Sequence, residues 1–215
     1  MKTILLKDAA ALIPNGASVM IGGFMGVGTP ERLVDELLRQ GKRNLTVIAN
    51  DNAVPGVGIG KLISAGAVKK TIASHIGLNP ETQKKMLAGE LEVDLVPQGT
   101  LIERIRAGGF GLGGVLTPTG VGTVVEEGKQ RIEVAGKPYL LETALRADFA
   151  LVQAFLADYI GNLYYALTAR NFNPVRAMAA DTVIVEADNI VPVGVIAPDN
   201  VVTPAPVVDY IVSHA

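Results

Sequence analysis

The chain has 215 residues, a formal net charge of −2 and no cysteine, and 49% of its residues are hydrophobic against 19% charged. The small negative charge excludes the basic face of a nucleic-acid binder, and the lack of cysteine excludes disulfides and a thiol nucleophile. No apolar run reaches the ~18 residues of a membrane span, so we expect no membrane partner. We expect one domain over residues 1–215 in the reducing cytoplasm, with surplus aliphatic side chains in a buried sheet or against other subunits.

Short aliphatic runs alternate with amphipathic segments through the first half of the chain. The aliphatic runs predict strands over residues 17–24, 45–50, 68–74 and 91–97, and the amphipathic segments predict helices over 30–41, 59–66, 79–90 and 100–109. Asn79 followed by Pro80 is typical of a helix start, and Thr100 with Glu103 fits a capping box. This order favours an α/β fold, with an open, mainly parallel sheet and helices on both faces.

The middle and the end of the chain have a different pattern. Residues 108–122 are rich in glycine and lack periodicity, which predicts a loop, and 123–142 alternate and turn at Gly128 and Gly136, as a small antiparallel ribbon does. Strand-like runs return at 148–158 and 181–187. Residues 201–212 are apolar but carry prolines, so we expect an extended segment packed on a neighbour or partner.

A glycine-rich loop over residues 21–31, IGGFMGVGTPE, joins the first predicted strand to the first predicted helix. Its glycines clear away side chains so that a ligand can reach the backbone, and the helix start at Thr29 and Pro30 offers unpaired N–H donors to an anion such as a phosphate. Glu31 stands where the fingerprint G-x-G-x-x-G needs glycine or alanine, and the loop has no lysine for a P-loop. A turn with only a packing role stays open from these residues alone.

Residues 15–30, NGASVMIGGFMGVGTP, meet every fixed position of the CoA-binding signature of family I CoA-transferases. Residues 89–109, 117–129 and 169–174 resemble further segments of the same α subunits, in the same order. The chain thus resembles the 3-oxoacid type α subunits over nearly its whole length, above all those of bacterial acetate and butyrate–acetoacetate CoA-transferases. The resemblance implies a three-layer CoA-transferase-like fold and an acyl pocket with Asn50 and Gln98. The CoA-binding residues that it implies are Gly22, Gly23, Phe24, Met25, Gly26, Val27 and Gly28.

The resemblance also implies a double displacement on a glutamate carboxylate. The carboxylate attacks a short-chain acyl-CoA, acetyl-CoA or acetoacetyl-CoA, and the glutamyl-CoA thioester that follows passes CoA to a short-chain carboxylate. In the family this glutamate lies in a Ser-Glu-Asn-Gly motif of the β half, and the present chain has no Ser-Glu pair. We therefore expect no catalytic residue in this chain, a β subunit partner in an α2β2 or α4β4 assembly, and CoA as a substrate with no tightly bound cofactor.

Several residues and two alternative functions stay undecided from the sequence. With two histidines and no cysteine we expect no metal site. The roles of His75, of Gly108–Gly114 and of Arg170–Pro174 stay open, as does the choice of acyl-CoA and carboxylate. The alternatives to a CoA-transferase subunit are a non-catalytic anion- or nucleotide-binding regulator on the same fold and a sugar-phosphate isomerase. The carboxylates that could act as a nucleophile in this chain itself are Glu31, Glu103, Glu126, Glu127, Glu142 and Glu186.

Overall fold

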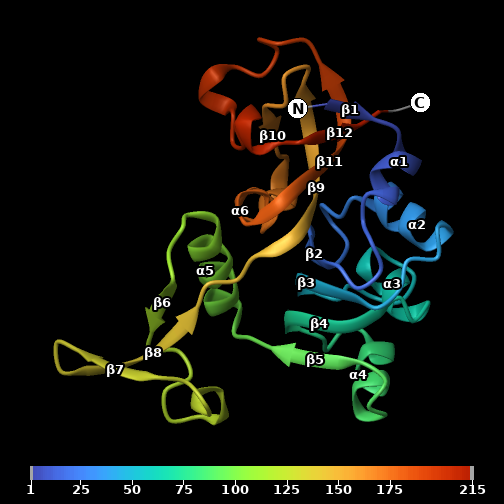
Figure 1. Cartoon of the computed structure of the whole chain (residues 1–215). Helices are drawn as coiled ribbons and strands as arrows, with labels where there is room; N and C mark the ends of the chain where they lie inside the picture. Colours follow the sequence, from blue (N-terminus) through green and yellow to red (C-terminus); the bar gives the residue numbers. More distant parts are fainter. Residues whose placement is uncertain (1, 214–215) are drawn as a thin grey trace.

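A computed structural model describes residues 2–213, and its main sheet runs in the order β1-β12-β11-β9-β2-β3-β4-β5 (Figure 1). Every pairing along this path is parallel, and the short strand β10 pairs antiparallel with β9. The strands are β1 (Lys2–Ile4), β2 (Ser18–Ile21), β3 (Leu45–Asp51), β4 (Val68–His75), β5 (Glu92–Leu95), β9 (Ala147–Asp158), β10 (Leu163–Tyr164), β11 (Ala180–Val191) and β12 (Tyr210–Val212). The predicted open, mainly parallel sheet is confirmed.

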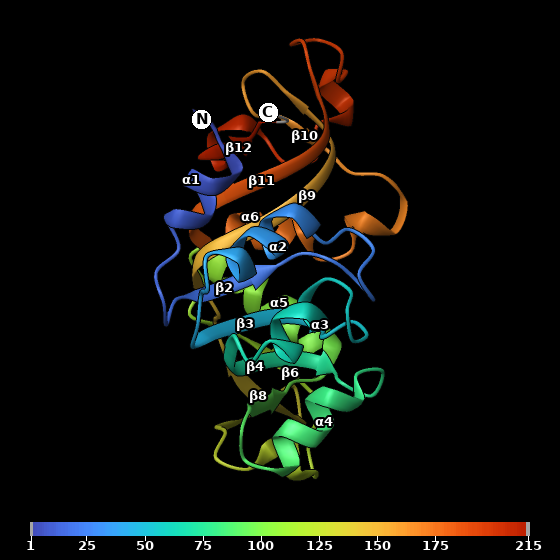
Figure 2. The same cartoon turned by 90° about the vertical axis from the view of Figure 1, so that its right-hand side faces the viewer.

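Helices cover both faces of this sheet, as the sequence predicts (Figure 2). The helices are α1 (Leu6–Ala11), α2 (Glu31–Arg39), α3 (Ile59–Ser64), α4 (Pro80–Leu87), α5 (Gln98–Gly109) and α6 (Asn173–Met178). Alternate residues of one strand belong to different cores: Val19 and Ile21 pack with α1, α2 and α3, whereas Met20 packs with α5 and α6. The strands are aliphatic throughout because both of their faces are buried.

The helix starts test two sequence predictions. Asn79 caps α4, since its Oδ1 accepts the N–H of Thr82 at 3.1 Å, and Pro80 is the first helical residue. The capping box at the next helix is wrong. Helix α5 begins at Gln98, so Thr100 lies inside its first turn, and Glu103 pairs with Arg106 at 3.0 Å instead. The helix begins two residues earlier than the sequence pattern predicts, because the extended segment before it ends at Pro97.

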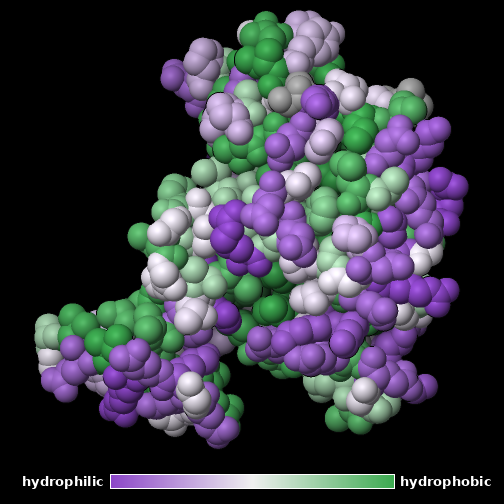
Figure 3. Space-filling view, in the orientation of Figure 1, coloured by the Kyte–Doolittle hydropathy of each residue, from purple (hydrophilic) through white to green (hydrophobic). Residues whose placement is uncertain are grey.

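A small antiparallel sheet, in the order β6-β8-β7, projects from the main body. Its strands are β6 (Gly114–Thr117), β7 (Arg131–Val134) and β8 (Lys137–Thr143), with the short 3-10 helix η1 (Val124–Glu126) before β7. The predicted ribbon is confirmed, but the predicted loop over 108–122 is partly wrong, because α5 runs through Gly109 and β6 pairs with β8. Apolar residues gather over this projection (Figure 3), where Leu116, Val124 and Val134 are exposed.

The end of the chain agrees in part with its prediction of an extended segment packed on a neighbour or partner. Residues 210–212 form the extended strand β12, which lies between the neighbouring strands β1 and β11. The 3-10 helices η2 (Leu167–Arg170), η3 (Pro198–Asn200) and η4 (Ala205–Val207) complete the described elements. Three-residue strands such as β1 and β12 carry too little pattern to be read locally, and only their mutual pairing defines them. Among residues 2–213, no helix is both long and apolar enough to cross a membrane.

The topology indicates where a ligand site can form. From β2 the chain continues through α2 to β3 on one side, while β9 pairs with β2 on the other side. Ligands of open parallel sheets bind at such a switch point, outside the carboxyl ends of the strands. The glycine-rich loop leaves the carboxyl end of β2 at this point.

Candidate functional site

The glycine-rich loop is a tight two-residue hairpin. Phe24 and Val27 exchange two backbone hydrogen bonds of 2.9 Å, and the two residues between them, Met25 and Gly26, have φ values of +50° and +88°. Positive φ at both central positions is the geometry of a turn that matches the twist of a β-hairpin. The turn exposes three apolar side chains, Phe24, Met25 and Val27, at its tip.

The glycines of this loop make room for the chain itself. A Cβ at Gly22 would lie 1.8 Å from Asn173 Oδ1, one at Gly23 would lie 2.1 Å from Thr29 Oγ1, and one at Gly26 would lie 2.4 Å from Val57 Cγ1. These glycines are therefore required by the packing of the chain itself, which the sequence interpretation did not include. They let the loop pack closely on its own neighbours, and Phe24, Met25 and Val27 stay exposed at its tip.

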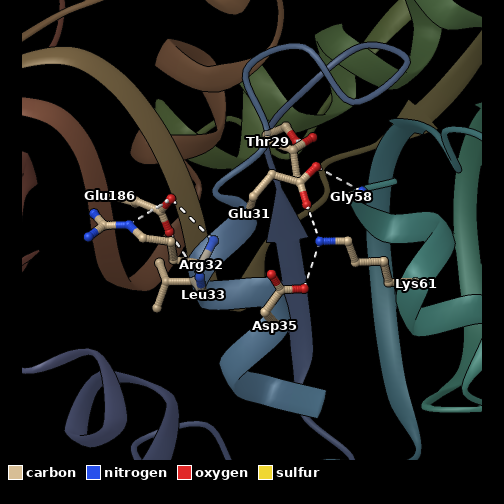
Figure 4. A network of polar contacts seen from close by, with 9 residues as sticks. Thr29, Glu31, Arg32, Leu33, Asp35, Gly58, Lys61 and Glu186 are labelled. Carbon is tan, nitrogen blue, oxygen red and sulfur yellow. Dashed lines mark hydrogen bonds and ion pairs between the residues drawn. The ribbon is translucent and has the colours of Figure 1, made fainter. Parts of the chain in front are cut away.

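The start of α2 does not offer the open donors that the sequence pattern predicts (Figure 4). The carboxylate of Glu186, on β11, accepts the N–H of Arg32 at 3.2 Å and the N–H of Leu33 at 2.9 Å. The Arg32 Nε atom also lies 3.3 Å from this carboxylate. An acidic side chain from the other half of the fold already occupies the anion site, so the prediction of a phosphate at this helix start is wrong.

Figure 4 also shows how the next loop is tied to α2. Lys61 Nζ lies 2.7 Å from both Glu31 and Asp35, and Glu31 Oε1 accepts the N–H of Gly58 at 2.9 Å. These contacts hold the segment that carries Val57 against the glycine-rich loop. Glu31 is thus an ion-pair partner at a helix start.

Three neighbouring polar side chains connect the predicted pocket residues to the loop. Gln98 Nε2 donates to Asn50 Oδ1 at 2.7 Å, and Asn50 Nδ2 donates to Asp51 Oδ2 at 3.2 Å. The Asp51 carboxylate then accepts the N–H of Met25 at 3.1 Å and that of Ala53 at 2.7 Å. A continuous chain of hydrogen bonds therefore runs from the start of α5 to the tip of the loop.

These residues meet because each follows or ends a parallel strand at the same edge of the sheet. Asn50 is 1% exposed, whereas Gln98 is exposed at the first position of α5. Sequence reasoning missed Asp51, although an aspartate beside Asn50 at a strand end was the available signal. Asp51 is the member of the group that touches the loop.

The start of α5 contrasts with that of α2. Pro97 precedes it, no side chain caps it, and no acidic residue lies in its first turn. The first N–H groups of a helix have no intrahelical acceptor and carry the positive end of the helix dipole. Together with the exposed Gln98 amide, this start offers neutral donors to a carboxylate or thioester oxygen without adding a charge.

A buried cation lies under the start of the loop. Arg176 on α6 is fully buried, donates from Nη1 to the carbonyl of Ile21, and faces the Phe172 ring at 4.8 Å. Burial lowers the pKa of Arg176 to about 9, and the negative charge of Asp51 opposes that shift. The guanidinium therefore stays charged at neutral pH and supports the strand end from which the loop leaves.

A cavity of about 330 Å³ lies beside the loop at the switch point between β2 and β9. Its ten lining residues include three carboxylates, those of Glu31, Glu186 and Asp188. Lys61 and Arg32 pair with the first two, and the lining residues include no cation that would attract a phosphate group.

Of the remaining sequence candidates, one lies beside this group and another is remote from it. His75 is exposed at the end of β4, in register with Asp51 on β3. Gly109 ends α5, about 16 Å along the helix from Gln98 at the usual rise per residue, so the Gly108–Gly114 segment is remote from the Gln98 amide. Within residues 2–213, no group of three or more histidine, aspartate or glutamate side chains is arranged to hold a metal ion.

The candidate nucleophiles can be placed in the same way. Glu103 pairs with Arg106, Glu126 with Arg131, and the buried Glu142 with Lys129 at 2.6 Å. Glu31 and Glu186 make the contacts at the start of α2 that are described above, and Glu127 is exposed beyond η1. None of these glutamates is among the residues that join Gln98 to the loop.

Comparisons with known proteins identify the family of the chain. The coenzyme A transferase family matches residues 3–214. The chain is 58% identical over 211 residues to the acetate CoA-transferase subunit alpha of Escherichia coli K12, covering 98% of this chain and 96% of that one. It is 52% identical over 213 residues to the acetoacetyl-CoA:acetate/butyrate CoA transferase alpha subunit of Clostridium acetobutylicum, covering 99% and 98%.

A solved structure shares the fold. An acyl-CoA transferase from Escherichia coli O157:H7, in a thioester complex with CoA, superimposes with a TM-score of 0.84 at 23% identity and covers 98% of this chain. The present chain spans 46% of that longer protein. Neither the regulator nor the sugar-phosphate isomerase is favoured by these comparisons. The resemblance drawn from residues 15–30 is confirmed, and the chain belongs to the coenzyme A transferase family.

Proposed function

We propose that this chain is the α subunit of an enzyme that moves CoA between a short-chain acyl-CoA and a short-chain carboxylate. The observation that carries the proposal is the hydrogen-bond chain from Gln98 through Asn50 and Asp51 to the N–H of Met25. It ties the residues proposed for the acyl pocket to the loop proposed for CoA. In this proposal residues 22–28 contact CoA, and Asn50 and Gln98 face the reacting acyl end.

The proposed roles follow from the charges on the two sides of the reaction. A carbonyl oxygen gains negative charge when a carboxylate attacks the thioester, and again when the CoA thiolate attacks the acyl anhydride that results. An exposed amide at Gln98 and the uncapped start of α5 can donate hydrogen bonds to that oxygen. Asn50 is buried and bonded to Gln98, so it orients the Gln98 amide.

The proposed nucleophile is a glutamate of a β subunit. Asp51, the carboxylate of the hydrogen-bond chain, already accepts hydrogen bonds from two backbone N–H groups and from Asn50. Its oxygens are therefore engaged in holding the loop. The exposed apolar side chains at the loop tip, Phe24, Met25 and Val27, suit a surface that a partner covers.

The assembly and the substrates are part of the same proposal. The curated relatives carry the name alpha subunit, which supports a β subunit as the partner. Acetyl-CoA or acetoacetyl-CoA and acetate, butyrate or acetoacetate are the proposed substrates, in a cytoplasmic α2β2 or α4β4 enzyme. CoA is bound as a substrate in each turnover.

The test uses the chain together with a partner that carries a Ser-Glu-Asn-Gly motif. The complex is incubated with acetyl-CoA and butyrate, and butyryl-CoA is measured by chromatography and mass spectrometry. We expect exchange by the complex, none by either chain alone, and none when the motif glutamate is changed to alanine. Exchange at full rate by this chain alone would refute the division of the site between two subunits.

A further inference from the structure

The segment over residues 167–178, which includes η2 and α6, lies directly behind the glycine-rich loop. It contains Arg170–Pro174, whose role was open from the sequence. Helix α6 contacts both β2 and β9, the two strands that flank the switch point. Two of its side chains reach the ends of the loop: Arg176 binds the carbonyl of Ile21, and Asn173 binds the carbonyl of Gly28.

Asn173 uses its whole amide to do this. It is 0% exposed, and its Nδ2 donates to the carbonyl of Gly28 at 2.9 Å and to that of Ala169 at 2.8 Å. Its Oδ1 accepts the N–H of Gln153, on β9, at 3.3 Å. The side chain therefore joins the end of the loop to η2 and to the central strand β9, and both of its amide hydrogens are used.

Asn173 also occupies the space that two loop glycines leave. A Cβ at Gly22 would lie 1.8 Å from Asn173 Oδ1, and all three of its nearest neighbours would be Asn173 atoms. A Cβ at Gly28 would lie 3.2 Å from Asn173 Nδ2 and 2.7 Å from the Ala169 backbone. The first and the last glycine of the loop thus pack against one side chain.

The rest of the loop is held independently. Thr29 Oγ1 donates to the carbonyl of Gly22 at 3.0 Å, and Asp51 accepts the N–H of Met25 at the tip. With Asn173 at the base, the hairpin is fixed at several points before any ligand arrives. A loop that is fixed in its binding conformation spends less ligand-binding free energy on ordering.

We propose that Asn173 is a positioning residue that sets the geometry of the 22–28 loop for its CoA-containing ligand. The inference rests on the proposed function, because it names what shapes the CoA loop of that site. Asn173 has no contact with solvent, so it acts through Gly22 and Gly28 and not on the substrate itself. A purely apolar side chain could fill the same volume but could not bind the carbonyl of Gly28.

The experiment uses the full chain in complex with its β subunit. The variants are Asn173→Ala, Gly22→Ala and the double variant, with Asn171→Ala as the matched control because Asn171 is exposed in the same segment. Steady-state kinetics with acetyl-CoA and butyrate give separate KM values, calorimetry gives the Kd for free CoA, and thermal unfolding gives Tm. Asn173→Ser, which keeps a small hydrogen-bonding side chain, serves if Asn173→Ala does not fold.

We expect Asn173→Ala to raise the KM for acetyl-CoA and the Kd for CoA about tenfold, because small misplacements of positioning groups are costly, while the KM for butyrate changes less than about twofold. Gly22→Ala should raise the same constants, since its Cβ meets Asn173. In the double variant the new Cβ enters the space that the Asn173 amide leaves. Its effect on Kd should therefore be smaller than the product of the two single effects.

Two outcomes would overturn the inference. One is a lower Tm for Asn173→Ala with wild-type KM and Kd for the CoA compounds, which is what a packing role alone produces. The other is a double variant whose Kd equals the product of the single effects. If the wild-type complex binds CoA but does not exchange it, the proposed function fails, and the Kd values still decide the role of Asn173. If it binds no CoA, both fail.

Discussion

Helices α2 and α5 both begin at the carboxyl-end edge of the main sheet, and their first turns differ in what occupies them. At α2 the donors are taken by Glu186, which arrives from β11. At α5 no side chain caps the helix and no acid lies in the first turn, and Gln98 and Asn50 stand beside it. The sequence pattern favoured the first helix as an anion site, and the structure favours the second. A helix start can bind a ligand only where the fold does not supply its own anion.

The largest effect should come from the open helix start. We expect Gln98→Ala to lower kcat for CoA exchange about 100-fold, the usual cost of losing one donor to a developing oxyanion. Because Gln98 is exposed but donates one hydrogen bond to Asn50, the free energy of unfolding should fall by about 1 kcal/mol. Gln130→Ala, at another exposed glutamine, is the control. If Gln98→Ala keeps the wild-type kcat, the start of α5 takes no part in the reaction.

The occupied helix start should show the opposite profile. Glu186→Ala leaves the N–H groups of Arg32 and Leu33 without their carboxylate, so we expect the free energy of unfolding to fall by about 2 kcal/mol. Denaturant titration measures this change, and Glu127→Ala, at an exposed glutamate, should leave stability unchanged. If Glu186→Ala is as stable as the wild type, water is an equally good hydrogen-bond acceptor for the N–H groups of Arg32 and Leu33.

A third variant converts the open start into an occupied one. A Cβ at Gly99 would meet no atom within 4 Å. Gly99→Glu should stabilise the protein by about 1 kcal/mol, because it replaces a glycine inside a helix and adds an acidic residue to the first turn. The KM values for acetyl-CoA and butyrate should rise, since the new carboxylate competes with the substrate for the donors. Gly99→Ala should gain stability without this loss, and equal kinetics for both variants would contradict the comparison.

The smallest expected effect concerns Asp148, a third carboxylate that accepts a backbone N–H of this chain. The N–H and Oγ of Ser18 donate to Asp148 at 2.8 and 2.7 Å, and these bonds hold the pKa of Asp148 below its usual value near 3.8. A lowered folded-state pKa stabilises the fold above the unfolded-state pKa, and this stabilisation is lost as the pH falls through the folded-state value. Ser18→Ala should thus cost under about 1 kcal/mol at neutral pH, as exposed contacts do.

Measurements in acid check this prediction. Ser18 Oγ also accepts the backbone N–H of Asp148 at 2.9 Å, and this bond does not depend on pH. Below the folded-state pKa of Asp148 the stability gap between the wild type and Ser18→Ala should therefore narrow to the contribution of that bond. A gap of the same size in strong acid and at neutral pH would contradict the role given to the Asp148 carboxylate.

Much of the architecture could be predicted because the governing patterns are local. Aliphatic runs and amphipathic segments predicted the strands from β2 to β5 and the helices between them, and Asn79 with Pro80 predicted a helix start. The proximity of Asn50 and Gln98 also follows from the topology, since parallel strands end at one edge. The short strands β1 and β12 and the capping box at Thr100 were missed or misplaced, because three residues carry too little periodicity and one proline moved a helix start.

The sequence by itself determined the α/β alternation, the family and the position of the glycine-rich loop, because each of these depends on contiguous residues. Only the tertiary structure decided what the glycines and the helix starts contact. Glu186 lies 154 positions from Arg32, and Asn173 lies 145 positions from Gly28. Contacts at such separations come from sheet order and helix packing, which no local pattern encodes. For that reason the loop first resembled an open anion site, and the structure shows a hairpin held by its own chain.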